Sequence, residues 1–397
     1  MNSTLKFILY LLSGLAVLGI LLYVFVFYKG TIVIGPTPYD AKTIIANQEK
    51  TGAAKFRLKP GSYNVKIEAP GYVSYEKRVD LKSAQKITLN ISLRKTPEPT
   101  KIISQETKFL FSGLDDTLLY LADGGKTLYR IGNLSLTNPE ITAITPNTFS
   151  DLTKIIWAPE RDLAVLKKAE STFLYDFKRY DLLHQEIHNW PAGIGDLIWS
   201  PDGKNTAYYF NPIEGERTII RADRSNENLE RLYNLKETAI VDPKLDWSKD
   251  SKKILIYTTD IYILDTYTKD FSRLTQNETI NGALFTPDSQ NIIFSNNQGL
   301  YIMDILGKNK RALDLKTSAK KIVFYSDEKN ILAAVPQAGK SDQLIKINIE
   351  SGEKKSLSFE SKTAMTFSNL TLLSEEKTLY FLSNEGLYSL DLTANEY

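Results

Sequence analysis

The stretch Trp199-Ser-Pro-Asp-Gly-Lys204 decides the fold, because it recurs along the second half of the chain. It returns as Trp247-Ser-Lys-Asp-Ser-Lys252 and Phe285-Thr-Pro-Asp-Ser-Gln290, and weaker copies begin at Phe111, Trp157, Phe324 and Leu372. The copies are spaced by 38 to 48 residues. One tight turn per repeat of this length, each followed by an apolar run, predicts one β-sheet blade per repeat. A blade cannot bury both of its faces alone, so the blades must stack in a ring.

The last repeat stops early, since only six residues follow Gly386-Leu-Tyr-Ser-Leu-Asp391. Its outer strand is therefore missing, and an open edge strand invites aggregation. The apolar segment Thr100-Lys-Ile-Ile-Ser104 precedes the first repeat, so we expect it to close the ring against the C-terminal blade. Seven blades fit the landmarks best, with six and eight as alternatives.

The first residues of the chain determine the predicted topology. Phe7 to Tyr28 contains 22 residues without a charge, and as a helix this stretch would be about 33 Å long, enough to cross a bilayer. It lacks the small-residue cleavage site of a secretory signal. Residues 1–29 are therefore predicted to be a retained transmembrane anchor. Lys6 lies on one side of the uncharged stretch and Lys29 on the other, so the positive charges that orient a membrane helix nearly balance. We expect a single pass through the cell membrane, with the N-terminus cytoplasmic and the large C-terminal part extracytoplasmic.

Charge is divided unevenly along the chain. Residues 29–95 hold 13 basic and 5 acidic residues, whereas residues 96–397 hold 35 basic and 42 acidic. A basic module next to the membrane suggests contact with anionic lipid or acidic wall polymer, with an ordinary solvated surface as the alternative. No basic patch interleaved with aromatic residues suggests nucleic acid. The chain contains no cysteine, which excludes disulfides, thiolate zinc sites and thiol catalysis.

Residues 30–95 alternate apolar and polar residues between Pro-Gly turns, which predicts about five strands in a small β-sandwich. The phrase Leu58-Lys-Pro-Gly-Ser-Tyr63-Asn-Val65, followed by Ala69-Pro-Gly-Tyr72, resembles the PEGA domain, and Pro38-x-x-Ala41 matches its entry. The resemblance implies a compact binding or spacer module of exported proteins, without catalytic residues. Residues 96–101 are rich in proline and charge and are predicted to be a stiff linker.

The repeats of residues 102–397 resemble the PD40 or TolB-like repeat, a WD40-like propeller motif. The full form occurs at Trp199 to Lys204. The fold class is therefore predicted to be all-β: a PEGA-like sandwich and a roughly seven-bladed β-propeller behind one transmembrane helix. Asp202 and Gly203 are interpreted as turn residues, and Trp199 is expected to pack between blades.

Candidate sites of chemistry are few. His184 and His188 are the only histidines; in a strand they lie some 13 Å apart, too far for one zinc ion. Asp115-Asp116 and Asp123-Gly-Gly-Lys126 lack the acidic spacing of a calcium loop and are better explained as turns. No G-x-S-x-G motif occurs. We therefore predict no catalytic residues, no metal and no cofactor, and leave the ligand-binding residues undefined.

These observations favour a non-enzymatic, membrane-anchored extracytoplasmic binding or scaffold protein. Its propeller would bind an envelope protein or a cell-wall polymer. Two alternatives remain open at this point: a glycan lyase or hydrolase that uses the propeller funnel, and a membrane scaffold that faces the cytoplasm.

Overall fold

The structure, a computed structural model, describes residues 11–19, 28–122, 126–134, 139–145, 149, 151–169, 171–177, 188–213, 215–384 and 386–396. Of the predicted anchor, residues 11–19 form a helix, while Phe7–Tyr10 and residues 20–27 lie outside the described ranges. Within those ranges, no helix combines the length and the apolarity needed to cross a membrane. The other described elements are strands and two short 3-10 helices, η1 (Ala319–Lys321) and η2 (Thr393–Asn395).

The chain divides into two compact units. Unit 1 contains residues 1–97 together with Ser358–Glu360 and Thr393–Tyr397, and unit 2 contains Glu98–Leu357 and Ser361–Leu392. Each is described here by itself.

Unit 1 contains two sheets that share one core. The first sheet has the order β4 (Ala54–Leu58), β1 (Gly30–Thr37), β7 (Lys86–Ser92), and β1 runs parallel to β7. The second has the order β3 (Gln48–Thr51), β2 (Lys42–Ile45), β5 (Gly61–Glu68), β6 (Tyr75–Leu81). Ile32, Phe56 and Ile67 are fully buried between the sheets, because alternate residues of each strand point to the same face.

The sequence predicted about five strands in this unit, and the structure has seven among the described residues. The two that were missed are β2 and β3, which form a hairpin. Its two turn residues, Ala46 and Asn47, have φ of 49° and 62°. Such left-handed pairs form the type I′ turn typical of two-residue hairpins. The sequence did not predict this turn, because alanine is not among the residue types that favour a type I′ turn.

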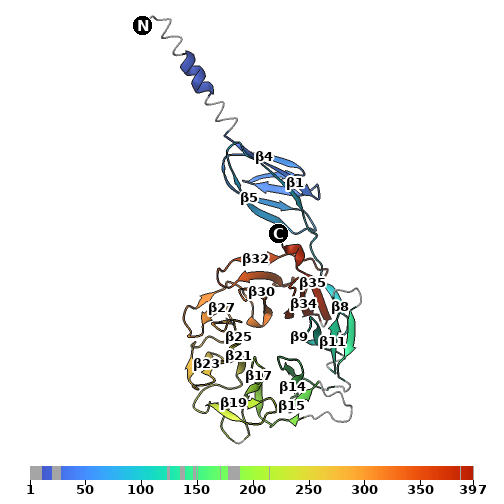
Figure 1. Cartoon of the computed structure of the whole chain (residues 1–397), viewed down its shortest axis with the longest axis vertical. Helices are drawn as coiled ribbons and strands as arrows, with labels where there is room; N and C mark the ends of the chain where they lie inside the picture. Colours follow the sequence, from blue (N-terminus) through green and yellow to red (C-terminus); the bar gives the residue numbers. More distant parts are fainter. Residues whose placement is uncertain are drawn as a thin grey trace. The chain divides into compact units, whose positions relative to one another are not determined.

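Unit 2 contains seven four-stranded antiparallel sheets within the described residues, arranged in a ring (Figure 1). We number them blades 1 to 7. Blade 1 has β9 (Lys108–Ser112), β10 (Leu118–Ala122), β11 (Thr127–Gly132) and β12 (Glu140–Ala143); blade 2 has β13 (Lys154–Trp157), β14 (Leu163–Lys167), β15 (Thr172–Asp176) and β16 (His188–Asn189); blade 3 has β17 (Ile194–Trp199), β18 (Asn205–Phe210), β19 (Thr218–Asp223) and β20 (Glu230–Asn234).

The remaining blades follow the same order. Blade 4 has β21 (Lys244–Trp247), β22 (Lys253–Tyr257), β23 (Ile261–Asp265) and β24 (Phe271–Arg273); blade 5 has β25 (Gly282–Phe285), β26 (Asn291–Asn296), β27 (Gly299–Asp304) and β28 (Arg311–Ala312); blade 6 has β29 (Ile322–Phe324), β30 (Asn330–Val335), β31 (Gln343–Asn348) and β32 (Lys354–Leu357); blade 7 has β33 (Ser368–Leu372), β34 (Thr378–Ser383) and β35 (Gly386–Asp391).

The outer strand of blade 7 comes from the other end of the propeller sequence. β8 (Thr100–Ile103) pairs antiparallel with β35, so that Ile103 lies opposite Leu387. This strand begins inside the segment 96–101 that the sequence predicted as a linker. The pairing covers the edge of β35, which would otherwise expose free N–H and C=O groups.

The first strand of each blade lies on the inner side of the ring (Figure 1). These strands contact one another directly, β17 with β13 and β21, and β33 with β29 and β9. Apolar side chains fill the spaces between successive blades. Trp199, for example, is 7% exposed and packs among Val165 and Leu174 of blade 2 and Tyr208 of its own blade.

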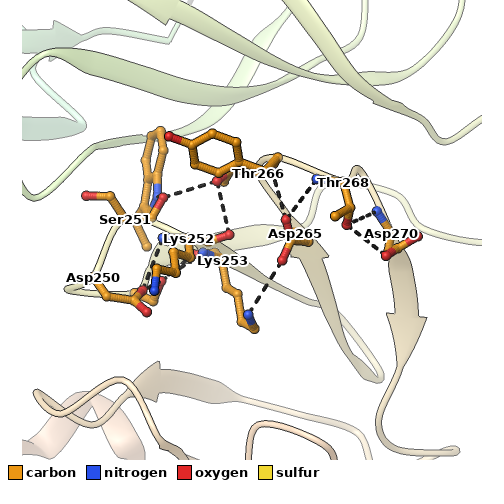
Figure 2. Close-up of polar contacts among 11 residues, drawn as sticks. Asp250, Ser251, Lys252, Lys253, Asp265, Thr266, Thr268 and Asp270 are labelled. Carbon is orange, nitrogen blue, oxygen red and sulfur yellow. Dashed lines mark hydrogen bonds and ion pairs between the residues drawn. The ribbon is translucent and has the colours of Figure 1, made fainter.

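The polar turns repeat as regularly as the strands do. Ser200, Ser248 and Thr286 each donate a hydroxyl hydrogen bond to the aspartate two residues on, at 2.6, 2.7 and 2.5 Å. Figure 2 shows blade 4, where Asp265 accepts hydrogen bonds from the N–H groups of residues 267 and 268 and pairs with Lys253 at 3.6 Å. These short-range bonds satisfy backbone groups that the turns leave without ladder partners.

Candidate functional site

A pocket of about 330 Å³ lies between blades 1 and 2. The turn between β9 and β10 forms one side, and the turn between β13 and β14 forms the other. Its lining combines aromatic, basic and acidic side chains, which is the mixture expected of a ligand site rather than of a core cavity. It is lined by Gly113, Leu114, Asp115, Thr117, Leu119, Arg130, Thr142, Ile144, Trp157, Glu160, Arg161, Asp162 and Phe177.

Aromatic rings form the apolar part of the pocket. Trp157 ends β13, and its ring centroid lies 4.6 Å from that of Phe177 and 6.4 Å from that of Phe111. Trp157 is 7% exposed. Its indole N–H is buried and has no hydrogen-bond partner among the described residues.

The two tryptophans at equivalent repeat positions differ in this respect. The indole N–H of Trp199 donates to the carbonyl of Ile156 at 3.0 Å, and that of Trp247 donates to the carbonyl of Ser251 at 3.1 Å. A buried donor without a partner carries a desolvation cost of about 1–3 kcal/mol. Among the three tryptophans at this repeat position, only Trp157 has an unpaired indole N–H, and Trp190, outside the repeat positions, has one as well.

Arg161 supplies a partly buried positive charge beside Trp157. Its Nε donates to the carbonyl of Ser112 at 2.9 Å, and its terminal nitrogens lie at 3.4 Å from the carbonyl of Ala158 and the hydroxyl of Ser112. No carboxylate of the described residues pairs with it. Burial lowers the pKa of Arg161 from its ordinary value, which is the sign of a cation held without a counter-ion.

Arg161 occupies a position whose backbone conformation is shared by the repeat turns. Arg161 has φ of 56°, and Gly203 and Ser251 occupy the same place in blades 3 and 4 with φ of 66° and 63°. The repeat turn thus holds its fifth residue in the left-handed region whatever its side chain. In blade 2 that side chain is a guanidinium directed toward blade 1, where it bonds Ser112.

Other charges surround the pocket. Arg130 of β11 and Asp115 of the β9–β10 turn are exposed and have no ion-pair partner within the described part of the chain. Asp162 accepts two hydrogen bonds from Arg224, at 2.8 and 3.0 Å, and Glu160 lies 3.8 Å from the same guanidinium. Arg224 therefore pairs with both carboxylates on the blade 2 side of the pocket and balances one of their two charges.

A second group of polar side chains belongs to the inner strands. Asp196 of β17 pairs with Lys154 of β13 at 2.5 Å and accepts the N–H of Leu245 of β21 at 2.9 Å. Asp246 accepts the N–H of Phe285 of β25 at 2.8 Å. Both carboxylates thus join the first strands of neighbouring blades, which is a structural role.

Burial raises the pKa of Asp246 to about 6, and the negative charge of Asp196 adds to this rise. The hydrogen bond from Phe285 acts in the opposite direction and is outweighed. As a whole residue, Asp246 is half-buried. Its carboxylate lies among the neighbouring inner strands, where it bonds the N–H of Phe285. Enclosure of this kind disfavours the charged form.

Of the described residues considered from the sequence as candidate sites, only Asp115 lines this pocket. His188 lies in β16, and His184 is outside the described residues. Asp116 accepts a hydrogen bond from the N–H of Ser374 at 2.9 Å, and its neighbour Asp115 lines the pocket. Asp123 to Gly125 are not among the described residues. The described part of the chain contains no group of three or more His, Asp or Glu side chains able to hold a metal ion.

Sequence reasoning named Trp157 only as the start of a weaker repeat and did not name Arg161. A signal was nevertheless present. The copy Trp157-Ala-Pro-Glu-Arg-Asp replaces the hydroxyl residue of Ser200, Ser248 and Thr286 by Ala158, so the turn loses the side-chain hydrogen bond from that hydroxyl and keeps only its backbone bonds. A repeat that abandons its own turn chemistry is a candidate for another role.

Comparison with known proteins identifies the first unit. The PEGA domain family matches residues 29–97. The chain matches none of the curated proteins. A solved structure assigned to TolB, from Agrobacterium tumefaciens, aligns with a TM-score of 0.40 and 14% identity over 57% of this chain and 89% of that one. Residues 29–97 of the chain thus match the PEGA domain family, and an all-β propeller follows them.

Proposed function

We propose that the chain is a membrane-anchored, extracytoplasmic binding protein without catalytic activity, and that its propeller binds an envelope protein or a cell-wall polymer in the pocket between blades 1 and 2. The observation that carries the proposal is the pocket itself, where the guanidinium of Arg161 has no carboxylate partner among the described residues and lies beside the rings of Trp157 and Phe177. A guanidinium without a counter-ion binds polar or anionic groups of a ligand through its N–H groups.

Two of the three carboxylates that line the pocket, Glu160 and Asp162, contact an arginine, which favours binding over hydrolysis. A general acid or base must be free to exchange a proton with the substrate. Asp162 is instead held by two hydrogen bonds from Arg224, which also lies near Glu160. The uncharged stretch Phe7 to Tyr28 supports the anchor, and the basic PEGA unit supports a position near anionic headgroups.

Topology is tested by adding a protease to intact cells. Digestion of the propeller, with a fragment retained in the membrane, would support the extracytoplasmic orientation. Protection of the whole chain until the cells are lysed would contradict it and favour the scaffold that faces the cytoplasm.

Binding is tested by site-specific crosslinking in the same cells. A photo-crosslinking residue at Leu114, which is 53% exposed and lines the pocket, is compared with one at Leu306, 68% exposed on blade 5. We expect a wall fragment or one envelope protein to be captured from position 114 and not from position 306. Equal capture at both positions would contradict binding in this pocket.

A further inference from the structure

The two sheets of the PEGA unit differ in charge. The strands of the first sheet, β4, β1 and β7, contain three basic residues and no acidic residue. The strands of the second sheet contain four of the five acidic residues found between positions 29 and 95: Glu49, Glu68, Glu76 and Asp80. Two of these carboxylates pair with lysines of the same sheet, Glu49 with Lys42 at 2.8 Å and Glu68 with Lys66 at 2.9 Å. Only the first sheet therefore carries charge of a single sign.

Strand register places the basic residues of the first sheet on its outer face. Burial alternates along β4, so that Lys55 and Arg57 are exposed while their neighbours in the strand are buried. Thr31 of β1 lies opposite Arg57 on one side and opposite Lys86 of β7 on the other. Lys55 lies opposite Val33, two residues further along β1. Because residues opposite one another, and residues two apart, point to the same face, the three basic side chains share that face.

Two further lysines extend this charge around the start of β1. Lys59 follows β4 directly, and Lys82 opens the turn that leads into β7. The turn is fixed, because the N–H of Lys82 donates to the side-chain oxygen of Gln85 and the N–H of Thr31 donates to the Gln85 carbonyl, both at 2.7 Å. A Cβ atom added at Gly30 would lie 2.7 Å from the carbonyl oxygen of Lys82, so this lysine lies against the first residue of β1. We call the five basic residues the basic face: Lys55, Arg57, Lys59, Lys82 and Lys86.

The basic face has no counter-ion within the described part of the chain. All five side chains are exposed, and none of them forms an ion pair there. Surface charges that serve only solubility are commonly interspersed with charges of the opposite sign, as they are on the second sheet. A face that gathers one sign repels itself and attracts an extended surface of the other sign.

The position of the basic face indicates which anionic surface it meets. β1 begins at Gly30, two residues after Tyr28, the last residue of the uncharged stretch. The hydroxyl of Ser83 donates to the carbonyl of Tyr28 at 3.2 Å, which attaches the Lys82 turn to the end of that stretch. The nearest row of basic residues lies one strand residue, about 3.3 Å, beyond Gly30. That distance is well within the Debye length of about 8 Å, measured from the point where the proposed anchor would leave the bilayer.

We propose that the outer face of the first PEGA sheet docks on anionic phospholipid headgroups, with the second sheet turned away from the membrane. The inference rests on the proposed anchor and adds a second binding surface to the proposed function. Basic side chains next to a bilayer are attracted to anionic lipids. Thr88 and Asn90, exposed on the same face of β7, add hydroxyl and amide donors for phosphate oxygens. Docking would fix the orientation of the PEGA unit on the membrane.

The test uses the full chain in phospholipid nanodiscs that contain a headgroup-labelled lipid as energy-transfer acceptor. The chain contains no cysteine, so one introduced cysteine carries the only fluorophore. Thr88→Cys labels the outer face of the first sheet, and Asn64→Cys labels that of the second. The two exposed positions are matched in height: Thr88 lies opposite Val33, three residues beyond Gly30, and Asn64 lies three residues beyond Gly61. A difference between them therefore reports which face meets the membrane.

Phosphatidylglycerol in the discs should increase energy transfer from position 88 and not from position 64, relative to discs of phosphatidylcholine alone. High salt should reverse the increase, because it screens the charges. Arg57→Gln combined with Lys86→Gln should lower the docking equilibrium constant about thirtyfold. Lys77→Gln combined with Arg78→Gln removes the same charge from β6 and should lower it about threefold at most. All four side chains are exposed, so both double variants should melt like the parent.

Several outcomes would overturn the inference. Equal transfer from positions 88 and 64 in discs with phosphatidylglycerol would show that this face does not dock. An increase that survives Arg57→Gln with Lys86→Gln would place the lipid contact elsewhere. Sodium polyphosphate that changes the fluorescence at position 88, without any approach of that position to the headgroups, would replace the lipid by a soluble anionic polymer.

The anchor is tested separately, by retention of the chain on phosphatidylcholine discs in high salt. Retention without any effect of phosphatidylglycerol would refute the docking alone. Release would refute the proposed anchor, and flotation of the full chain with phosphatidylglycerol vesicles would then decide the docking, with the same two double variants as probe and control. Flotation that the Arg57 and Lys86 variant loses would support the basic face, and its absence in the parent chain would refute it.

Discussion

At the scale of single residues, the repeat turn determines the backbone conformation of its fifth residue and leaves the side chain at that position free to vary. The fifth residue of every repeat copy has a positive φ, between 51° and 66°, and only one of the seven is glycine: Asp115, Arg161, Gly203, Ser251, Ser289, Glu328 and Glu376. A left-handed non-glycine residue costs about 1–2 kcal/mol. The turn backbone bond offsets that cost in blade 2, where it is 2.9 Å long, and in blade 4, where it is 2.8 Å long. The side chain is therefore free to vary, and blade 2 uses it for Arg161.

Asp246 provides a pH-dependent prediction at the same scale. Its pKa in the folded protein is about 6, above the value of about 3.9 for an unperturbed aspartate. Between these values the folded state binds more protons than the unfolded state, so this group lowers stability as pH rises from 4 to 6. Asp246→Asn, which can still accept from Phe285, should gain about 1–3 kcal/mol over the parent at pH 7.5 and almost nothing at pH 4.

Urea unfolding of both proteins at the two pH values measures this difference. The exposed Asp314→Asn serves as the matched control, since its carboxylate is largely in water. A stability gain of Asp246→Asn that is equal at both pH values would show that the proton on Asp246 is not responsible. A loss at pH 7.5 would show that the charged carboxylate stabilises the junction of β21 and β25.

At the scale of elements, the strand that closes the ring has the greatest consequence. β8 comes before blade 1 in sequence and pairs with β35 of blade 7, so one blade contains both ends of the propeller chain. Ile103 is 7% exposed and packs with Leu387 and Tyr380 of blade 7 and with Leu110 of blade 1. Its side chain therefore joins the first and last blades.

Ile103→Ala should lower the free energy of unfolding of the propeller by about 2–4 kcal/mol, because it removes buried apolar surface where the ring closes. Thr100→Ala, an exposed position of the same strand, should change it by less than about 0.5 kcal/mol. Denaturant unfolding monitored by tryptophan fluorescence gives both values. If the two variants unfold alike, β8 contributes little to closure.

The sequence predicted elements well wherever a turn had a strong signal. The Ser-Pro-Asp-Gly-Lys phrase located the blades, and the unpaired end of the last repeat located β8. The hairpin of β2 and β3 was missed because Ala46 adopts a left-handed conformation that alanine seldom adopts. The pocket was missed for a different reason. Its residues come from two blades, Arg130 of β11 and Trp157 of β13, and a single sequence does not show which side chains meet across blades.

At the scale of the whole molecule, the chain contains two hydrophobic systems that form from different residues. The core of the PEGA unit consists of buried side chains from β1, β2, β4, β5 and β6 with Ala41 and Leu93, while the propeller clusters are built between adjacent blades. Separate cores allow separate unfolding transitions, since a multidomain chain need not unfold in one step. The propeller blades, by contrast, share clusters with both neighbours, so they should unfold together.

Phe56→Ala tests this division. Phe56 is fully buried in the PEGA core, and truncation of a buried phenylalanine costs about 3–5 kcal/mol. Calorimetry of the full chain should show one transition moved to lower temperature and the other unchanged. Ile103→Ala should move the complementary transition, because Ile103 lies in a propeller cluster. If either variant moves both transitions, the two units are coupled, and a ligand bound in the propeller pocket would then stabilise the PEGA unit as well.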